Sequence, residues 1–253
     1  MQLVESIASL IIGLAVIAFL SRVLRLQYQQ WEFSNPRRAA IVGILVVSVN
    51  ILIMSLLVIM LGSSSATGNA FEDRGPENYT CGDVLGQAVV LLIVITPILI
   101  AMRTRKETWA SAGITRQNLL RSGAVGLIVV AIQMVYLAAT AGFHRSLVTG
   151  HFWAFLQYTV VGFAEEFMFR GYLQTRVCAW LGKYSGWLIT SVIMALSHFA
   201  HRMTFEHQNA WAALASCAGL IPISLLFGYL YQRTGNIMAP GIAHTFANWI
   251  ETL

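Results

Sequence analysis

Eight apolar segments follow one another along the chain, most of them close to the ~20 residues that cross a bilayer as a helix. They cover residues 3–24, 39–62, 84–102, 120–139, 152–172, 186–199, 210–231 and 237–250. Charged residues make up 11% of the chain, against about 25% in ordinary soluble domains. This pattern excludes a soluble globular protein, a disordered tail and a coiled coil. It predicts an all-α, polytopic membrane protein of about eight transmembrane helices.

Basic residues lie at the ends of these segments and indicate an orientation in the membrane. When the loop after the first segment is placed in the cytoplasm, 13 of the 16 Lys and Arg residues fall on that side. These are Arg22, Arg25, Arg37, Arg38, Arg103, Arg105, Lys106, Arg116, Arg121, Arg170, Arg176, Lys183 and Arg233. Arg74, Arg145 and Arg202 fall on the other side, as do both termini. The net charge of +5 is therefore interpreted as a topology signal, and no nucleic-acid partner is expected. Few lysines and short loops are typical of a bacterial inner-membrane protein.

Three ionisable residues interrupt the fifth segment, and ionisable groups inside a membrane are functional candidates by default. Glu166 and Arg170 are separated by four residues, so they can pair on one face of a helix. Glu165 points about 100° away from Glu166 and has no local partner. A desolvated carboxylate of this kind can act as a general base. Alternatively, Glu166 and Arg170 form an ion pair that only stabilises the fold, and Glu165 extends to the membrane interface; the sequence pattern would be the same.

Polar residues at a similar depth follow in the sixth and eighth segments. His198 lies near the end of the sixth, while His244 and Asn248 share one face of the eighth. Each of the three sites lies roughly 8–20 Å from the predicted cytoplasmic face. This agreement favours one shared cavity between the C-terminal four helices over three separate polar packing contacts. A carboxylate, two histidines and an amide donor suit activation of water against a carbonyl group.

Other designs of intramembrane hydrolase do not fit the chain. It contains no HExxH and no GxSG motif, and its two aspartates, Asp73 and Asp83, lie in one polar loop. The remaining pattern, Glu165-Glu166-xxx-Arg170, then His198, then His244-xxx-Asn248, resembles the CPBP family of CAAX-processing and bacteriocin-processing intramembrane endopeptidases, also called the ABI family. Met194 stands where the family usually has the Phe of an FxxxH motif. This departure affects an apolar packing position.

The resemblance implies a role for each matched residue. Glu165 would activate the water, His198 would hold that water, and Glu166 with Arg170 would form a supporting pair. His244 and Asn248 would bind the oxyanion. It also implies a division into N-terminal transmembrane helices (1–150) and a CPBP-type catalytic core (151–253), within one integrated membrane domain.

The resemblance leaves the metal requirement open. Glu165, His198 and His244 could instead be three zinc ligands with an open fourth position. A metal-free site is preferred, because Glu165 cannot be both a ligand and a free base.

The leading hypothesis is an endopeptidase that cuts near the cytoplasmic side of the membrane. Its substrate would be a lipidated C-terminus, a leader-type peptide or a membrane-anchored protein. A non-catalytic bacteriocin-immunity or membrane regulatory protein could use the same polar cluster to bind a peptide. A proton-coupled transporter ranks last, because the chain shows no internal symmetry.

Overall fold

The computed structural model describes residues 2–26, 30–62, 78–140 and 148–252, with residues 2–9, 62, 140 and 251 described by backbone alone. Every regular element within these ranges is a helix. In chain order they are α1 (Gln2–Val23), α2 (Pro36–Gly62), α3 (Cys81–Thr104), η3 (Trp109–Ala112), α4 (Leu119–Thr140), α5 (Thr149–Glu166), η4 (Phe167–Gln174), α6 (Thr175–Leu181), α7 (Lys183–Ser197), α8 (Phe199–Thr204), α9 (Ala210–Gly219), α10 (Ile221–Thr234), α11 (Met238–Trp249) and η5 (Ile250–Thr252).

The eight predicted apolar segments all fall on helices, and the all-α membrane architecture is confirmed. Four helical segments in the described part of the chain are long and apolar enough to cross a bilayer: Pro36–Leu61, Cys81–Thr104, Leu119–Ala139 and Ala210–Thr234. The last of these joins α9 to α10. A shorter apolar stretch, Leu10–Val23, lies in α1.

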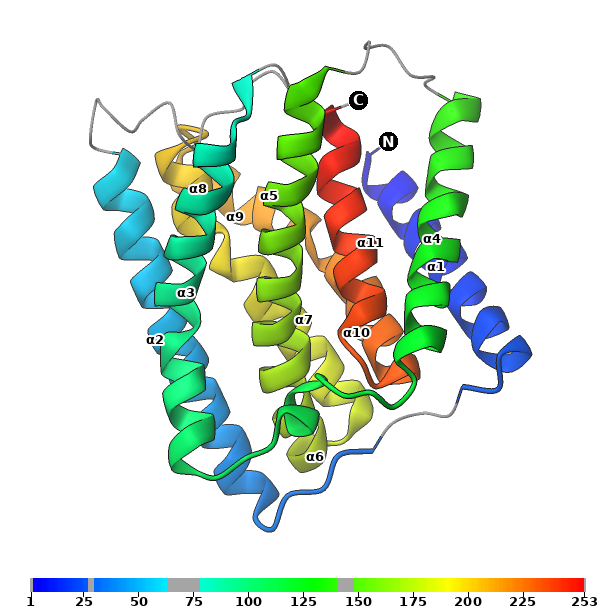
Figure 1. Ribbon diagram of the computed structural model, residues 1–253, viewed down its shortest axis with the longest axis vertical. Coiled ribbons are helices and arrows are strands. Elements are labelled where there is room, and N and C mark those ends of the chain that lie inside the picture. The colour runs from blue at the N-terminus through cyan, green and yellow to red at the C-terminus, as the bar shows by residue number, and fades with distance from the viewer. Residues whose placement is uncertain (1, 27–29, 63–77, 141–147, 253) are drawn as a thin grey trace.

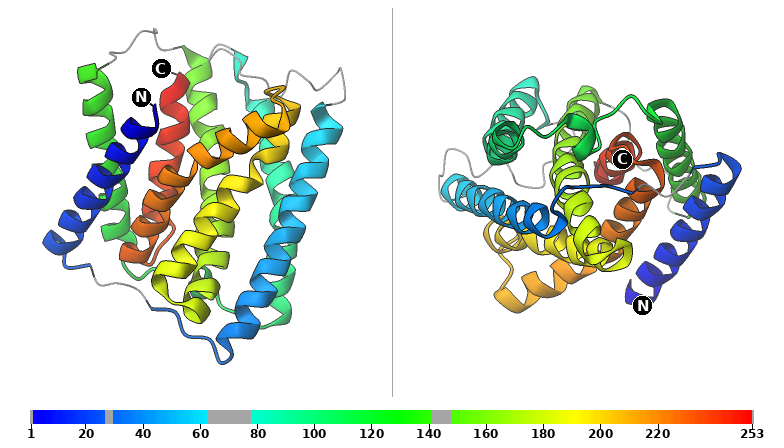
Figure 2. Two further views of the ribbon diagram at one scale, coloured as in Figure 1. Left: turned by 180° about the vertical axis from the view of Figure 1, so that it is seen from behind. Right: turned by 90° about the horizontal axis from the view of Figure 1, so that it is seen from below.

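The continuous helical stretch α5–η4–α6 runs through the middle of the molecule (Figure 1). Seen from below, α2 and α3 lie on one side of α5, while α11 and α4 lie on the other (Figure 2). α5 packs against α11 and α3, α11 packs against α4, and α10 packs against α7 and α1. Helices from both halves of the chain therefore surround the segment that carries Glu165 and Glu166.

The helices alternate in direction, so their connections collect at two opposite ends of the molecule. The end of α3 and the starts of α2 and α4 lie at the lower end in Figure 1. We call this the basic end, because basic residues of the segment boundaries gather there, such as Arg37, Arg103 and Lys183. The end of α2, the end of α11 and α8 lie at the opposite end, which we call the α8 end.

The predicted distribution of charge follows these two ends as far as the structure describes them. Arg202 lies in α8, at the α8 end, whereas Arg74 and Arg145 lie outside the described residues. The start of α1 and the end of α11 lie toward the α8 end (Figure 1). The assignment of the basic end to the cytoplasm stays a prediction from the charge rule.

Candidate active site

A π-helix follows directly after the two glutamates. It covers Phe167–Gln174 between α5 and α6, and all of its residues are buried. Such wider turns inside α-helices occur frequently at functional sites. Gly171 makes the packing around it possible, because a Cβ atom there would lie 2.2 Å from the carbonyl oxygen of Ala112 in η3. The sequence pattern predicted a helix here but gave no sign of its π form.

Glu166 lies at the centre of a buried charged network. Its Oε2 is 3.3 Å from Nε of Arg170, and both side chains are almost fully buried. Its Oε1 is 3.0 Å from Nδ1 of His244, so the carboxylate joins the end of α5 to α11. Arg170 also donates from Nη2 to the hydroxyl and carbonyl oxygens of Ser224, at 3.1 and 3.2 Å. Ser224 in turn donates to the carbonyl of Ser191.

The sequence therefore accounted for one of the four residue pairs in this network. The pairing of Glu166 with Arg170 follows from their spacing. The contact with His244 joins residues 78 positions apart, and that of Arg170 with Ser224 joins residues 54 apart. Ser224 was missed, because a serine in an apolar helix carries no signal of its own.

Glu165 faces two histidines at once. Its Oε2 lies 3.9 Å from Nε2 of His198 and 3.8 Å from Nε2 of His244. This oxygen is buried and has no hydrogen-bond partner in the described part of the structure. Both distances exceed the 2.7–3.2 Å of a direct hydrogen bond, and contacts of this length are often bridged by water. The arrangement therefore offers three polar atoms to a single water molecule.

Each histidine ring is held by a contact at its other nitrogen. Nδ1 of His198 lies 3.1 Å from the carbonyl oxygen of Met194, so this nitrogen carries the proton and Nε2 can accept. Met194 itself is buried in the hydrophobic core, as expected for an apolar packing position. An ionised Glu166 only accepts hydrogen bonds, so Nδ1 of His244 is also protonated. The His244 ring stacks on Phe227 with centroids 4.9 Å apart.

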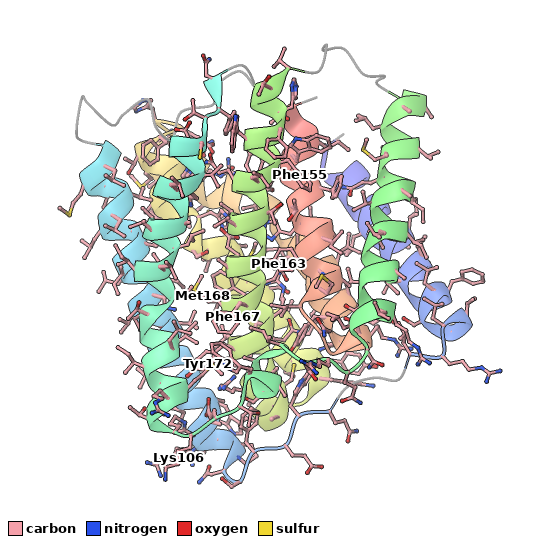
Figure 3. All side chains as sticks on the ribbon, in the orientation of Figure 1. Lys106, Phe155, Phe163, Phe167, Met168 and Tyr172 are labelled. Atoms are coloured by element: carbon pink, nitrogen blue, oxygen red, sulfur yellow. The ribbon has the colours of Figure 1, made fainter. Side chains whose placement is uncertain are left out.

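Two glycines bring α11 close enough to α5 for these contacts. A Cβ on Gly162 would lie 3.1 Å from the backbone nitrogen of Thr245, and one on Gly241 would lie 2.8 Å from the Phe163 ring. Small residues at crossing points are the usual way for membrane helices to approach closely. Figure 3 shows Phe163 on α5 just before the labelled η4 residues Phe167 and Met168. The close contact thus lies next to the two glutamates.

Asn248 is the one candidate residue that the structure does not join to the others. It lies one turn beyond His244 on α11, and its side chain makes no hydrogen bond with the residues that the structure describes. The other five candidates, Glu165, Glu166, Arg170, His198 and His244, form one connected group. Their catalytic roles stay predictions.

The comparisons with known proteins concern the part of the chain that carries this group. A family model described as "Type II CAAX prenyl endopeptidase Rce1-like" matches residues 146–250. We call the matched residues 146–250 the Rce1-like region. The match confirms the resemblance to the CPBP family there, and these residues include all six candidates.

One curated relative is similar to a part of the chain. It is the uncharacterized protein YpbD of Bacillus subtilis (strain 168), which is 33% identical over 85 residues. The match covers 34% of this chain and 36% of YpbD, so the chain spans about a third of the relative that it matches. No solved structure gives a match.

A cavity of about 90 Å³ opens beside Glu165 and His198. Its lining comes from α2 (Ile51, Met54, Ser55 and Val58), from α5 and η4 (Glu165, Met168 and Phe169), and from the end of α7 through α8 (Ser197, His198, Ala200 and His201). One water molecule needs about 10–15 Å³ by this measure, so the cavity has room for several waters or for a substrate side chain. The sequence placed the cavity between the C-terminal helices, and α2, outside the Rce1-like region, adds a wall to it.

A zinc site was the open alternative for Glu165, His198 and His244. Across the residues that the structure describes, no three His, Cys, Asp or Glu side chains are arranged to hold a metal ion. The preference for a metal-free site stays a prediction, and no step proposed below passes through a metal.

Proposed function

We propose that this chain is an intramembrane endopeptidase in which Glu165 activates a water molecule against a peptide bond. The observation that carries the proposal is the position of Glu165 Oε2, within 3.9 Å of Nε2 of both His198 and His244 and without a hydrogen bond of its own. The match of the surrounding residues to an endopeptidase family supports the same reaction. The substrate would be a membrane-associated peptide or protein.

The first step would use the water between Glu165 and His198. The unprotonated Nε2 of His198 accepts one hydrogen of the water, and the carboxylate of Glu165 takes the other as a proton. The oxygen then attacks the carbonyl carbon of the substrate, and a tetrahedral intermediate with a negative oxygen forms. Glu165 would later give its proton to the departing amine, which restores the carboxylate.

The oxyanion would be stabilised from α11. His244 would donate to the oxyanion from Nε2 when both of its ring nitrogens carry protons, with Nδ1 donating to Glu166. Asn248 would supply the second donor once the substrate is bound. Glu166 and Arg170 act through His244, because they hold its ring at Nδ1. Oxyanion donors of this kind typically contribute about 10²–10³-fold to the rate.

The test compares newly formed protein N-termini in host membranes that contain wild type or Glu165→Gln at equal expression. General-base catalysis typically contributes about 10²–10⁴-fold, so the termini produced by the enzyme should vanish with the Gln variant. Glu32→Gln, which removes a carboxylate outside the cavity, serves as the matched control and should leave them unchanged. Identical profiles for wild type and Glu165→Gln would refute the catalytic proposal and leave peptide binding as the function.

A further inference from the structure

The exposure of the site residues increases in one direction. The side chain of His244 is 6% exposed and that of Glu165 is 13% exposed. His198, which lies farther toward the α8 end, is 26% exposed, and His201 in α8 reaches 41%. Glu165, His198 and His201 all line the cavity beside the catalytic group. The path from the reacting atoms to the surroundings therefore leads toward α8.

The opposite direction is closed. Every residue from 166 to 178 is buried, which corresponds to about 18 Å of helix toward the basic end. Arg176 lies in this run, pairs with Glu107 and contacts the face of the Tyr172 ring at 3.7 Å. Trp31 stacks on the buried Tyr231 with ring centroids 5.3 Å apart. Packed aromatic and paired charged side chains thus separate Glu165 from the basic end.

The part of α2 that lines the cavity also lies toward the α8 end. Ile51, Met54, Ser55 and Val58 follow the spacing i, i+3, i+4 and i+7, so one stripe of α2 faces the cavity. α2 starts at the basic end with Pro36, which places this stripe about 22–33 Å from that start. α2 also packs against α8. Three of its four cavity-lining residues are apolar, which suits an apolar stretch of polypeptide.

We propose that substrate reaches Glu165 from the α8 end, between α2 and α8. The excess of Lys and Arg at the basic end assigns the α8 end to the non-cytoplasmic half of the membrane. The substrate class is then an exported or membrane-anchored polypeptide whose apolar segment presents its scissile bond from that half. This replaces the expectation of a cut near the cytoplasmic side. The substrate part of the inference rests on the proposed function, whereas the direction of access does not.

The test measures which side of the membrane gives water-borne access to the cavity. Of the three cysteines in the chain, Cys81 is exposed and Cys178 and Cys217 are buried, so a Cys81→Ser background has no accessible thiol. Single variants Ser55→Cys, in the cavity, and Thr108→Cys, exposed at the basic end, are added in turn. Right-side-out and inside-out vesicles are treated with a charged, membrane-impermeant methanethiosulfonate reagent.

We expect Ser55→Cys to react at least tenfold faster in right-side-out vesicles, and Thr108→Cys at least tenfold faster in inside-out vesicles. Leu56→Cys is the matched control, because this neighbouring α2 residue is exposed but does not line the cavity. A lipid-facing thiol should stay unreactive in both preparations. Serine to cysteine changes little volume, so the cavity variant should fold.

Three results would overturn the inference. Reaction of Ser55→Cys from the same side as Thr108→Cys, or from neither side, would refute access from the α8 end. If Ser55→Cys reacts from the cytoplasmic side and Thr108→Cys from the other side, the proposal of an exported substrate is refuted. The labelling needs no turnover, so it stands even if the comparison with Glu165→Gln shows no proteolysis.

Discussion

The buried pair of Glu166 and Arg170 makes a quantitative prediction. Both side chains are at most 1% exposed, so Arg170→Met would leave the Glu166 carboxylate buried with only His244 beside it. Removal of one partner from a buried pair costs about 3–5 kcal/mol in the free energy of unfolding. For a chain of this size, each kcal/mol lowers the melting temperature by about 2–4 °C. The expected decrease is therefore about 6–20 °C.

The assay is thermal unfolding of the purified protein in detergent, with a matched pair as control. Arg202 and Glu206 have the same i, i+4 spacing in and after α8, but their side chains are 25% and 31% exposed. Exposed pairs contribute about 0–1 kcal/mol, so Arg202→Met should lower the melting temperature by at most about 4 °C. Comparable decreases for Arg170→Met and Arg202→Met would refute the argument from burial.

The double variant Glu166→Gln with Arg170→Met separates stability from catalysis. The double variant contains neither charge, so no unpaired carboxylate is left buried, and the melting temperature should recover to within a few degrees of wild type. Cleavage should stay low, because the introduced amide lacks the carboxylate charge with which Glu166 holds Nδ1 of His244. A double variant that regains both stability and cleavage would show that Glu166 has no part in positioning that ring.

Two further predictions concern the π-helix and the metal requirement. Gly171→Ala should lower the free energy of unfolding by about 1–3 kcal/mol, because the added Cβ would clash with the Ala112 carbonyl. Gly86→Ala is the control, because a Cβ there meets nothing within 4 Å and should not be destabilising. Equal melting temperatures for the two variants would contradict this prediction. Incubation with a zinc chelator should leave cleavage unchanged, and loss of cleavage that added zinc restores would refute the metal-free mechanism.

The sequence predicted those features of the site that depend on local spacing. Residues four apart on a helix are neighbours, so Glu166 and Arg170 could be paired without a structure. The apolar segments placed the helices, and the order of the motifs placed His198 and His244 at a common depth. These predictions need only the length and period of a helix.

Other features depend on contacts between distant segments. Phe227 stacks on His244 and Ser224 accepts from Arg170, yet both are ordinary residues of an apolar helix. In η4, Gly171 packs against the backbone of η3, 59 residues earlier in the chain. The sequence gives no sign of this contact with the Ala112 carbonyl, because every residue has a backbone carbonyl.

The N-terminal half of the chain contributes to the surroundings of the Rce1-like region. α2 supplies a wall of the cavity, η3 packs its Ala112 carbonyl against Gly171, and Glu107 pairs with Arg176 in the closed run. None of these elements lies within residues 146–250, whereas all six candidate residues do. The candidate residues thus lie in one part of the chain, whereas the cavity beside them takes its walls from both parts. If Glu165 activates water as proposed, a protein that shares only residues 146–250 would keep that carboxylate beside a cavity with a different α2 wall.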